Sequence, residues 1–241
     1  MVRFVAETCV LPHGVASLDP RDPAFHGRHL DLANYHFDEA YHNGDVWVWL
    51  SGPVVSALVK HGGVAEAWRQ TAMLRDLLFT EGAAGTLPEL RNGVPPERGD
   101  NVAGAVSQAW SLAEFLRNFY QDYLGFRPDL LNHTVELAPA LPPGLTWVHA
   151  PVRVGGGSLV LFYEVAEDGE SAVYRLSGER TLPRLTVRLA ARVPPCAEFA
   201  PDVARAEAVL EPGATLAFRV ARGVAGWAVE IASRESQEGT S

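Results

Sequence analysis

The chain has 241 residues, enough to bury one large core or two modest ones. Its hydrophobic content of 47% is that of a globular protein, and its net charge of −9 provides no basic face for a nucleic-acid backbone, so we expect no nucleic-acid partner. No apolar run reaches the roughly 18 residues of a membrane span, and Glu7 stands where a signal peptide needs apolar residues. We therefore expect a cytoplasmic protein without a membrane partner.

Up to residue 132, three segments carry apolar residues at helical spacing. They cover residues 47–58, 64–78 and 112–123, and glycine or proline follows each of them. The first 40 residues and residues 82–104 are rich in Gly, Pro, Asp and Asn and are expected to be loops. Loops of this length within a compact domain are often functional.

Residues 133–232 instead alternate with a period of two and are divided by turn signals rich in Gly and Pro. This pattern predicts a small antiparallel β-domain, and we expect a sandwich. The expected strands are 134–137, 158–165, 185–193, 215–220 and 227–231. Residues 233–241 are polar and are expected to form a flexible tail.

Metal and cofactor signals are weak. His26 and His29 lie among Gly and Pro residues that provide no helix and no third ligand. The run Gly155–Gly157 precedes no helix and no Lys-Ser/Thr pair, so it predicts a turn and not a phosphate loop. Cys9 and Cys196 have no motif around them, and two free thiols are favoured over a disulfide. We expect no metal and no cofactor.

The first segment that offers chemistry is Tyr41-His42-Asn43-Gly44-Asp45-Val46-Trp47-Val48-Trp49. Its aromatic rings and hydrogen-bonding groups suit a sugar, whose C–H faces stack on aromatic rings while its hydroxyls seek polar partners. The alternative is that Trp47 and Trp49 anchor a core helix, and the residues alone favour neither interpretation.

The second segment, Gly85-Thr86-Leu87-Pro88-Glu89-Leu90-Arg91-Asn92-Gly93, places one carboxylate in a loop between two helices. A glutamate in such a loop can activate water as a general base in glycoside hydrolysis. Without other information a solvated loop glutamate is the better interpretation, and Glu81, Glu97 and Asp100 are equally eligible by composition.

The third segment, Ser107-Gln108-Ala109-Trp110-Ser111, opens the last helical stretch. Gln108 and Trp110 have the chemistry to contact a sugar. Equally, Trp110 fits a core position and Gln108 fits a hydrogen bond that ties down a loop. The spacing does not decide between these roles.

In this order and spacing, the three segments resemble signatures of the glycogen debranching enzymes. Tyr41–Trp47 is similar to the Tyr-His-Asn/Gln-Gly-Thr-Val-Trp signature, Leu87–Leu90 to the Pro-Glu loop, and Gln108–Glu114 to the Gln-Ala-Trp-Ser-x-Ala-Glu helix start. Pro12–Leu18 and Asp22–Phe25 resemble the approach to the first signature. Two residues depart from the family pattern: Asp45 replaces the usual Thr, and Val48 stands where Pro is common.

The resemblance implies that residues 1–132 are the C-terminal helices and active-site loops of an (α/α)6 barrel. It further implies inverting hydrolysis of the α-1,6-linked glucose at glycogen branch points. Glu89 matches the general base. The substrate-binding candidates are Tyr41, His42, Trp47, Trp49, Gln108 and Trp110. The acid-bearing part of such a barrel lies upstream of anything in this sequence.

We therefore expect a glycosidase fragment or subunit that acts on glycogen or another branched α-glucan. An upstream polypeptide is expected to complete the barrel, or the chain is expected to associate with itself. Two alternatives stay open: a non-catalytic carbohydrate-binding or assembly subunit, and another (α/α)6 glycosidase of trehalase-like or glucoamylase-like type.

Overall fold

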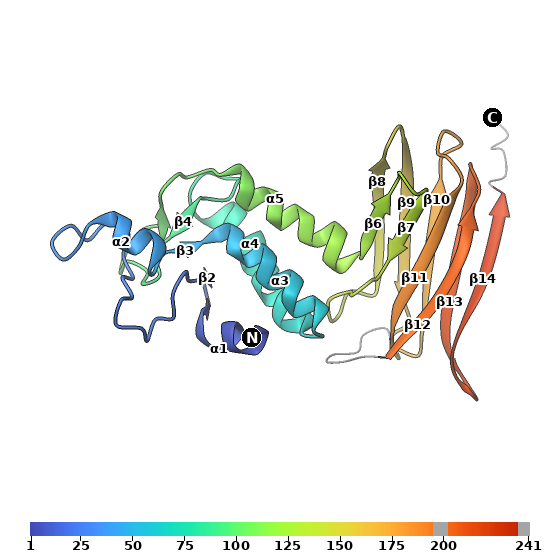
Figure 1. Cartoon of the computed structure of the whole chain (residues 1–241), viewed down its shortest axis with the longest axis horizontal. Helices are drawn as coiled ribbons and strands as arrows, with labels where there is room; N and C mark the ends of the chain where they lie inside the picture. The colour runs from blue at the N-terminus through green and yellow to red at the C-terminus, as the bar shows by residue number, and fades with distance from the viewer. Residues whose placement is uncertain (195–201, 236–241) are drawn as a thin grey trace. The chain divides into compact units, whose positions relative to one another are not determined.

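The computed structural model describes residues 1–194 and 202–235, and the chain forms two compact units, Met1–Phe119 and Tyr120–Ser241 (Figure 1). The first unit contains helices and very short strands, and the second contains antiparallel β-sheets, which confirms the predicted α+β class. The boundary between the helical and the β-rich part was expected at residue 132. It falls earlier because β6 (Phe126–Asp129) already pairs with β7 (Thr134–Leu137).

The three helical segments that the apolar spacing predicts are confirmed. They are α3 (Ser51–Lys60), α4 (Val64–Thr80) and α5 (Ala109–Arg117), and a π-helical turn (Asn118–Tyr123) continues α5. Positive φ angles at Gly62 and Gly82 match the ends of α3 and α4, because this backbone conformation costs glycine little.

Two helices form within the first 42 residues. The helix α1 (Val2–Thr8) lies in a stretch expected to be a loop, and it buries none of its residues, so its core signal in the sequence is weak. The helix α2 (Phe37–His42) covers the start of the first motif. A capping box closes its N-terminus: the His36 side chain accepts a hydrogen bond from the Asp38 amide, and the Glu39 side chain accepts one from the His36 amide.

Short strands connect the loops of the first unit. The hairpin of β1 (Val10–Leu11) and β2 (Gly14–Val15) forms one ladder. The strands β3 (Val46–Trp47), β4 (Leu90–Arg91) and β5 (Val102–Ala103) form another, and a 3-10 turn (Val48–Leu50) leads from β3 into α3. Each strand has only two residues, so a period of two cannot reveal it in the sequence.

The second unit contains a five-stranded and a four-stranded sheet (Figure 1). The five-stranded sheet has the order β14 (Gly226–Glu235), β13 (Ala214–Gly223), β10 (Ser171–Gly178), β9 (Gly157–Val165), β8 (Trp147–Val154). The four-stranded sheet has the order β12 (Asp202–Leu210), β11 (Leu185–Val193), β7, β6. The β7–β11 pair is parallel, which departs from the expectation of an entirely antiparallel domain.

One buried apolar cluster includes residues of both sheets, such as Leu137, Leu189, Leu161 and Phe218. Alternate residues of β9 and β11 enter it, as expected for strands with one covered face. The strands β6, β8, β10 and β12 were not predicted. Residues 233–235, expected in the tail, belong to β14, whereas residues 236–241 and Cys196 lie outside the described residues.

Candidate active site

The small β3–β4–β5 sheet aligns the first two motifs and the loop that follows them. Trp47 pairs with Leu90, and Leu90 pairs with Ala103. The Val48 amide donates to the Glu89 carbonyl at 3.3 Å, and the Glu89 amide donates to the Ala105 carbonyl at 2.8 Å. These backbone bonds place Glu89 between the first motif and residues 102–105.

Both carboxylate oxygens of Glu89 accept hydrogen bonds. The Tyr41 hydroxyl donates to Oε1 at 2.8 Å, and the Ala105 amide donates to Oε2 at 3.1 Å. The residue is half-buried, so the carboxylate is oriented without being sealed from solvent. Burial, together with the hydrogen bond to Glu89, raises the pKa of the Tyr41 hydroxyl, which keeps this group a neutral donor.

Aromatic rings surround this contact. The Trp47 indole donates to the Tyr41 carbonyl at 2.7 Å, and the Tyr41 and Trp47 ring centroids lie 4.5 Å apart. Trp110 lies 6.0 Å from Trp47 between ring centroids and is 44% exposed, while the His42 ring stacks on Trp47 at 6.3 Å. An exposed indole beside a half-buried one provides a surface on which a sugar ring can stack.

The third motif holds the Pro-Glu loop through backbone contacts. The Gln108 amide donates to the Leu87 carbonyl at 2.8 Å, and the Ser111 hydroxyl donates to the Pro88 carbonyl at 2.9 Å. Gln108 is the N-cap residue of α5 and is half-buried. The backbone of Gln108 therefore ties down the Pro-Glu loop. Its side chain remains a candidate for binding substrate.

Trp49 is set apart from the other predicted aromatic residues. It lies half-buried in the 3-10 turn, and among the described residues its ring makes no aromatic contact with Tyr41, Trp47 or Trp110. The structure thus brings Tyr41, His42, Trp47, Glu89 and Trp110 together, supported by Gln108, and does not bring Trp49 into that group.

The sequence analysis did not predict a histidine–aspartate pair beside these motifs. His29 Nδ1 lies 2.6 Å from Asp45 Oδ2, and Asp45 is 0% exposed. Burial raises the pKa of the Asp45 carboxyl, and the hydrogen bond with His29 opposes that change. The sequence signal was Asp45 itself, a carboxylate that replaces the usual Thr of the motif.

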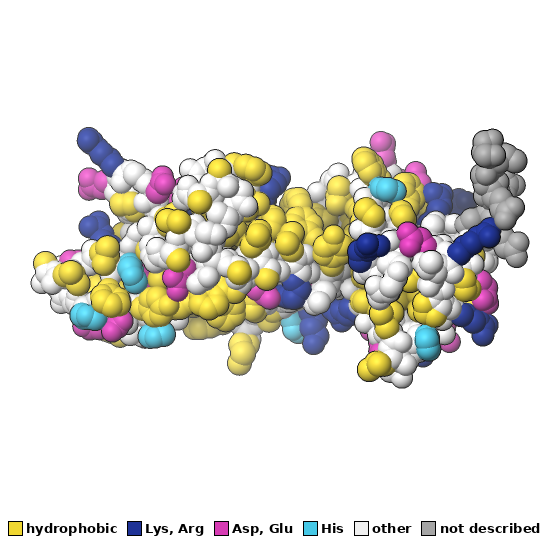
Figure 2. Space-filling model, turned by 90° about the horizontal axis from the view of Figure 1, so that it is seen from above, with side chains coloured by type: hydrophobic (Ala, Val, Ile, Leu, Met, Phe, Trp, Pro, Cys, Tyr) yellow, Lys and Arg dark blue, Asp and Glu magenta, His cyan; other side chains and the backbone are white. Residues whose placement is uncertain are grey.

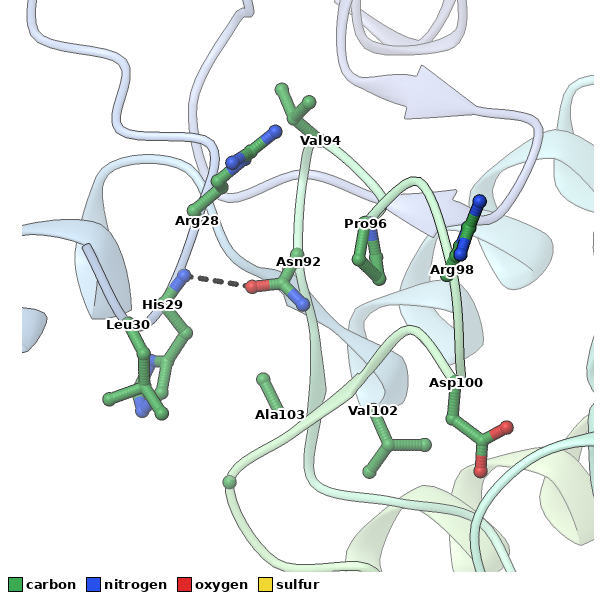
Figure 3. Close-up of a pocket in the computed structure, with 11 residues that line it drawn as sticks. Arg28, His29, Leu30, Asn92, Val94, Pro96, Arg98, Asp100, Val102 and Ala103 are labelled. Atoms are coloured by element: carbon green, nitrogen blue, oxygen red, sulfur yellow. Dashed lines mark hydrogen bonds between the residues drawn. The ribbon is translucent and has the colours of Figure 1, made fainter.

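His29 also lines a pocket of about 480 Å³ between the loop after Phe25 and the loop on either side of β5 (Figure 3). Its polar lining includes Arg28, Asn92, Arg98 and Asp100, and Val102, Ala103 and Gly104 complete one side. Figure 3 shows the Asn92 side chain reaching the His29 main chain, where its Oδ1 accepts from the His29 amide at 2.9 Å. Gly104, which lines the pocket, also lies close to Glu89, since a Cβ at Gly104 would lie 2.9 Å from Glu89 Oε2.

An ion pair between buried Arg91 and half-buried Glu81 supports the same loops. Arg91 Nη2 donates to Glu81 Oε1 at 2.7 Å, and Glu81 Oε2 accepts from the Asn101 amide at 3.2 Å. The Asn101 and Asn92 side chains bond each other at 3.2 Å. Glu81, which by composition was equally eligible as the general base, instead accepts hydrogen bonds from Arg91 and Asn101.

Within residues 1–194 and 202–235, no three His, Cys, Asp or Glu side chains gather closely enough to hold a metal ion. His26 and His29 have different partners, Glu39 and Asp45. Across the same described ranges, no helix combines the length and the apolar character that crossing a bilayer requires.

The family model of amylo-alpha-1,6-glucosidase matches residues 1–117. Over those residues the chain is similar to the amylo-alpha-1,6-glucosidase family. The match includes all three motifs and ends with α5, so it leaves the β-rich unit outside. Comparisons with curated proteins and with solved structures found no match.

Proposed function

We propose that the chain is part of a glycoside hydrolase that removes α-1,6-linked glucose from the branch points of glycogen or a related α-glucan. In this proposal residues 1–119 contribute the last helices and active-site loops of an (α/α)6 barrel, in the cytoplasm. The similarity of residues 1–117 to the amylo-alpha-1,6-glucosidase family supports the substrate class.

The observation that carries the proposal is the bond between Tyr41 and Glu89. A general base for hydrolysis must present a fixed carboxylate toward a water molecule. The Tyr41 hydroxyl and the Ala105 amide fix the two oxygens of Glu89, and Trp47 and Trp110 provide a stacking surface beside it. Glu89 would then activate the water that attacks the anomeric carbon.

Inverting hydrolysis needs a second carboxyl group about 6.5–9.5 Å from the base, to protonate the leaving oxygen. We propose that an upstream polypeptide of the barrel provides this acid. The chain by itself is then expected to hydrolyse α-1,6-glucosides barely or not at all. Strong turnover by the purified chain, abolished by substituting an acid within it, would contradict this assignment.

The experiment is an assay on a branched limit dextrin, with the chain reconstituted with the candidate upstream polypeptide. Glu89→Gln keeps the shape of the side chain but removes the base. It is expected to lower kcat by about 10²–10⁴ while leaving oligosaccharide binding nearly unchanged. Glu97→Gln, in an exposed part of the same loop region, is the matched control and is expected to retain full activity.

The exposed apolar side chains of the first unit indicate that it binds a partner. Figure 2 shows hydrophobic side chains gathered along this unit, and Phe4, Phe79 and Leu116 are among the exposed ones. Large exposed apolar patches mark interfaces or aggregation-prone surfaces. We expect self-association or a stable complex with the upstream polypeptide, and a monomer in sedimentation velocity that binds no hydrophobic dye would contradict this expectation.

A non-catalytic carbohydrate-binding subunit is the second candidate. The exposure of Trp110 next to Trp47 favours it, because such a pair binds sugar without any catalytic acid. The two candidates differ in the reconstitution assay. A binding subunit leaves the Glu89→Gln complex as active as the wild type.

A further inference from the structure

His29 is held at three places. Its Nδ1 contacts Asp45 Oδ2 at 2.6 Å, its amide donates to Asn92 Oδ1 at 2.9 Å, and its ring lies 6.0 Å from that of Tyr41 between centroids. The side chain is 13% exposed. A ring fixed in this way presents its remaining nitrogen, Nε2, in a defined direction.

Nε2 has no hydrogen-bond partner among residues 1–194 and 202–235, although His29 lines the pocket. The Asp45 carboxylate determines what Nε2 can do. When Nδ1 carries the proton that Asp45 accepts, the neutral imidazole presents a lone pair at Nε2. Hydrogen bonding at one ring nitrogen thereby fixes the other as an acceptor.

In the described part of the chain, the Asp45 side chain makes no hydrogen bond other than that to His29. Its Oδ1 is buried without a hydrogen-bond partner in the described part of the chain, and the side chain is 0% exposed. A buried carboxylate with an unsatisfied oxygen is costly. Its contact with His29 is the compensating interaction that the structure provides.

The pocket chemistry suits a neutral polyhydroxyl ligand. Asn92 and Asp100 bring hydrogen-bonding side chains to the lining, while Asp100 and Asp45 behind His29 offset the charges of Arg28 and Arg98. In Figure 3 the side chains of Arg28 and Arg98 point away from Val102 and Ala103. A volume of about 480 Å³ is within the usual range for small-molecule sites.

We infer that this pocket is a saccharide subsite in which His29 Nε2 accepts a hydrogen bond from a sugar hydroxyl and Asp45 positions the ring. The inference rests on the proposed function and extends it, because Gly104 lines the pocket and also lies beside Glu89. His29 is thus a specificity residue and Asp45 a positioning residue.

The first test measures binding of an α-1,6-branched glucose trisaccharide to the full chain by calorimetry. His29→Ala is expected to weaken binding about tenfold, the usual effect of one lost hydrogen bond. His149→Ala, an exposed histidine of β8, is the matched control and is expected to bind as the wild type does. Trp110→Ala reports on the stacking surface independently.

The outcomes separate the two ideas. If Trp110→Ala weakens binding and His29→Ala does not, the subsite is wrong while the proposed function stands. If the wild type binds no saccharide, the subsite is wrong, whereas the proposed function is judged by the reconstitution assay.

A second measurement uses the ring nitrogens of His29 in the wild type and so does not depend on a variant that folds. Nitrogen-15 NMR is expected to show the tautomer with the proton on Nδ1, and the trisaccharide is expected to shift the Nε2 resonance. Asp45→Asn is expected to let both tautomers appear, an effect that a purely structural role of Asp45 would not produce. An Nε2 chemical shift that does not change when the trisaccharide is added would overturn the inference.

Discussion

The two units of this chain differ in what they bury. The β-rich unit is built around one continuous apolar cluster, with aromatic residues such as Tyr163, Tyr174 and Phe218 fully buried. The helical unit has a smaller apolar cluster and buries several polar side chains. In the described residues these are Asp45, Ser51, Gln70, Thr71, Arg91, Asn101, Ser111 and Asn118.

This difference indicates that the β-rich unit is built for stability, whereas the helical unit carries the groups suited to chemistry. Apolar burial is the dominant favourable term in folding, whereas buried polar groups are costly unless they are paired. The unit that carries the costly groups is also the one that holds Glu89, His29 and the motifs of the amylo-alpha-1,6-glucosidase family. Natural sequences tolerate such local conflicts mainly at functional sites.

The largest expected effect is in the β-rich unit. Phe218→Ala removes a fully buried ring and is expected to lower the free energy of unfolding of that unit by about 3–5 kcal/mol. Urea unfolding followed by NMR signals of residues 120–235 measures this change. Phe79→Ala, which removes an exposed phenylalanine, is the control and is expected to change stability by less than about 0.5 kcal/mol. Equal effects of both substitutions would remove the contrast between the units.

The next effect tests the polar interior of the helical unit. Arg91→Met removes the ion-pair partner of Glu81, which keeps only the Asn101 amide, and the Arg91 side chain is only 7% exposed. We expect a loss of about 2–3 kcal/mol, below the full cost for a buried pair because Glu81 retains some solvent access. Chemical unfolding measures it. Arg75→Met, which breaks the exposed pair with Asp76, is expected to have no measurable effect, and a large loss there would contradict the argument.

Tyr41→Phe sharpens the comparison at the site itself. Removing the hydroxyl frees Glu89 Oε1, so in the reconstituted enzyme kcat/KM is expected to fall about tenfold with little change in stability. Steady-state kinetics on the branched dextrin measure the change. Tyr120→Phe, which alters an exposed tyrosine, is the control. Unchanged kinetics in Tyr41→Phe would mean that the bond to Glu89 does not matter for the reaction.

The smallest effect is a pH dependence confined to the helical unit. Burial, and then the charge of Arg91, lowers the pKa of His13 below its ordinary value of 6.5. The contribution of neutral His13 to stability is therefore present above pH 6.5 and is lost as the pH falls through its folded-state pKa. His13→Gln is expected to flatten the fall in stability over that range. Identical thermal-unfolding profiles for both proteins between pH 7.5 and pH 5 would contradict this expectation.

Periodicity in the sequence predicted the elements that are long and covered on one side. The helices α3, α4 and α5 and the strands β7, β9, β11, β13 and β14 are of this kind. The strand β10 shows the same alternation through Ala172, Tyr174 and Leu176 and was detectable. The edge strand β12 also alternates, but its inward positions Ala204, Ala206 and Ala208 are small, so its apolar signal is weak.

The site was predictable only as far as its motifs extend. Glu89, Tyr41, Trp47 and Trp110 carry a signature, whereas the partner of Asp45 depends on how a loop folds back. His29 lies 16 residues before Asp45, at a spacing that no regular element imposes. The pairing of two-residue strands and the contacts of a loop depend on tertiary structure. They produce no periodic pattern in the sequence from which they could be predicted.

The first two motifs meet through strands of only two residues each, and the third is attached by single hydrogen bonds such as that from the Gln108 amide to the Leu87 carbonyl. So few bonds affect how the protein moves. Few backbone bonds hold β3, β4 and β5, so these amides are expected to exchange with solvent through local opening, well before the core of the β-rich unit unfolds. The amides of Val48, Glu89 and Gln108 then exchange faster than that of Leu161. A saccharide that spans the motifs would slow them, and the fraction of molecules with an assembled site would rise with occupancy.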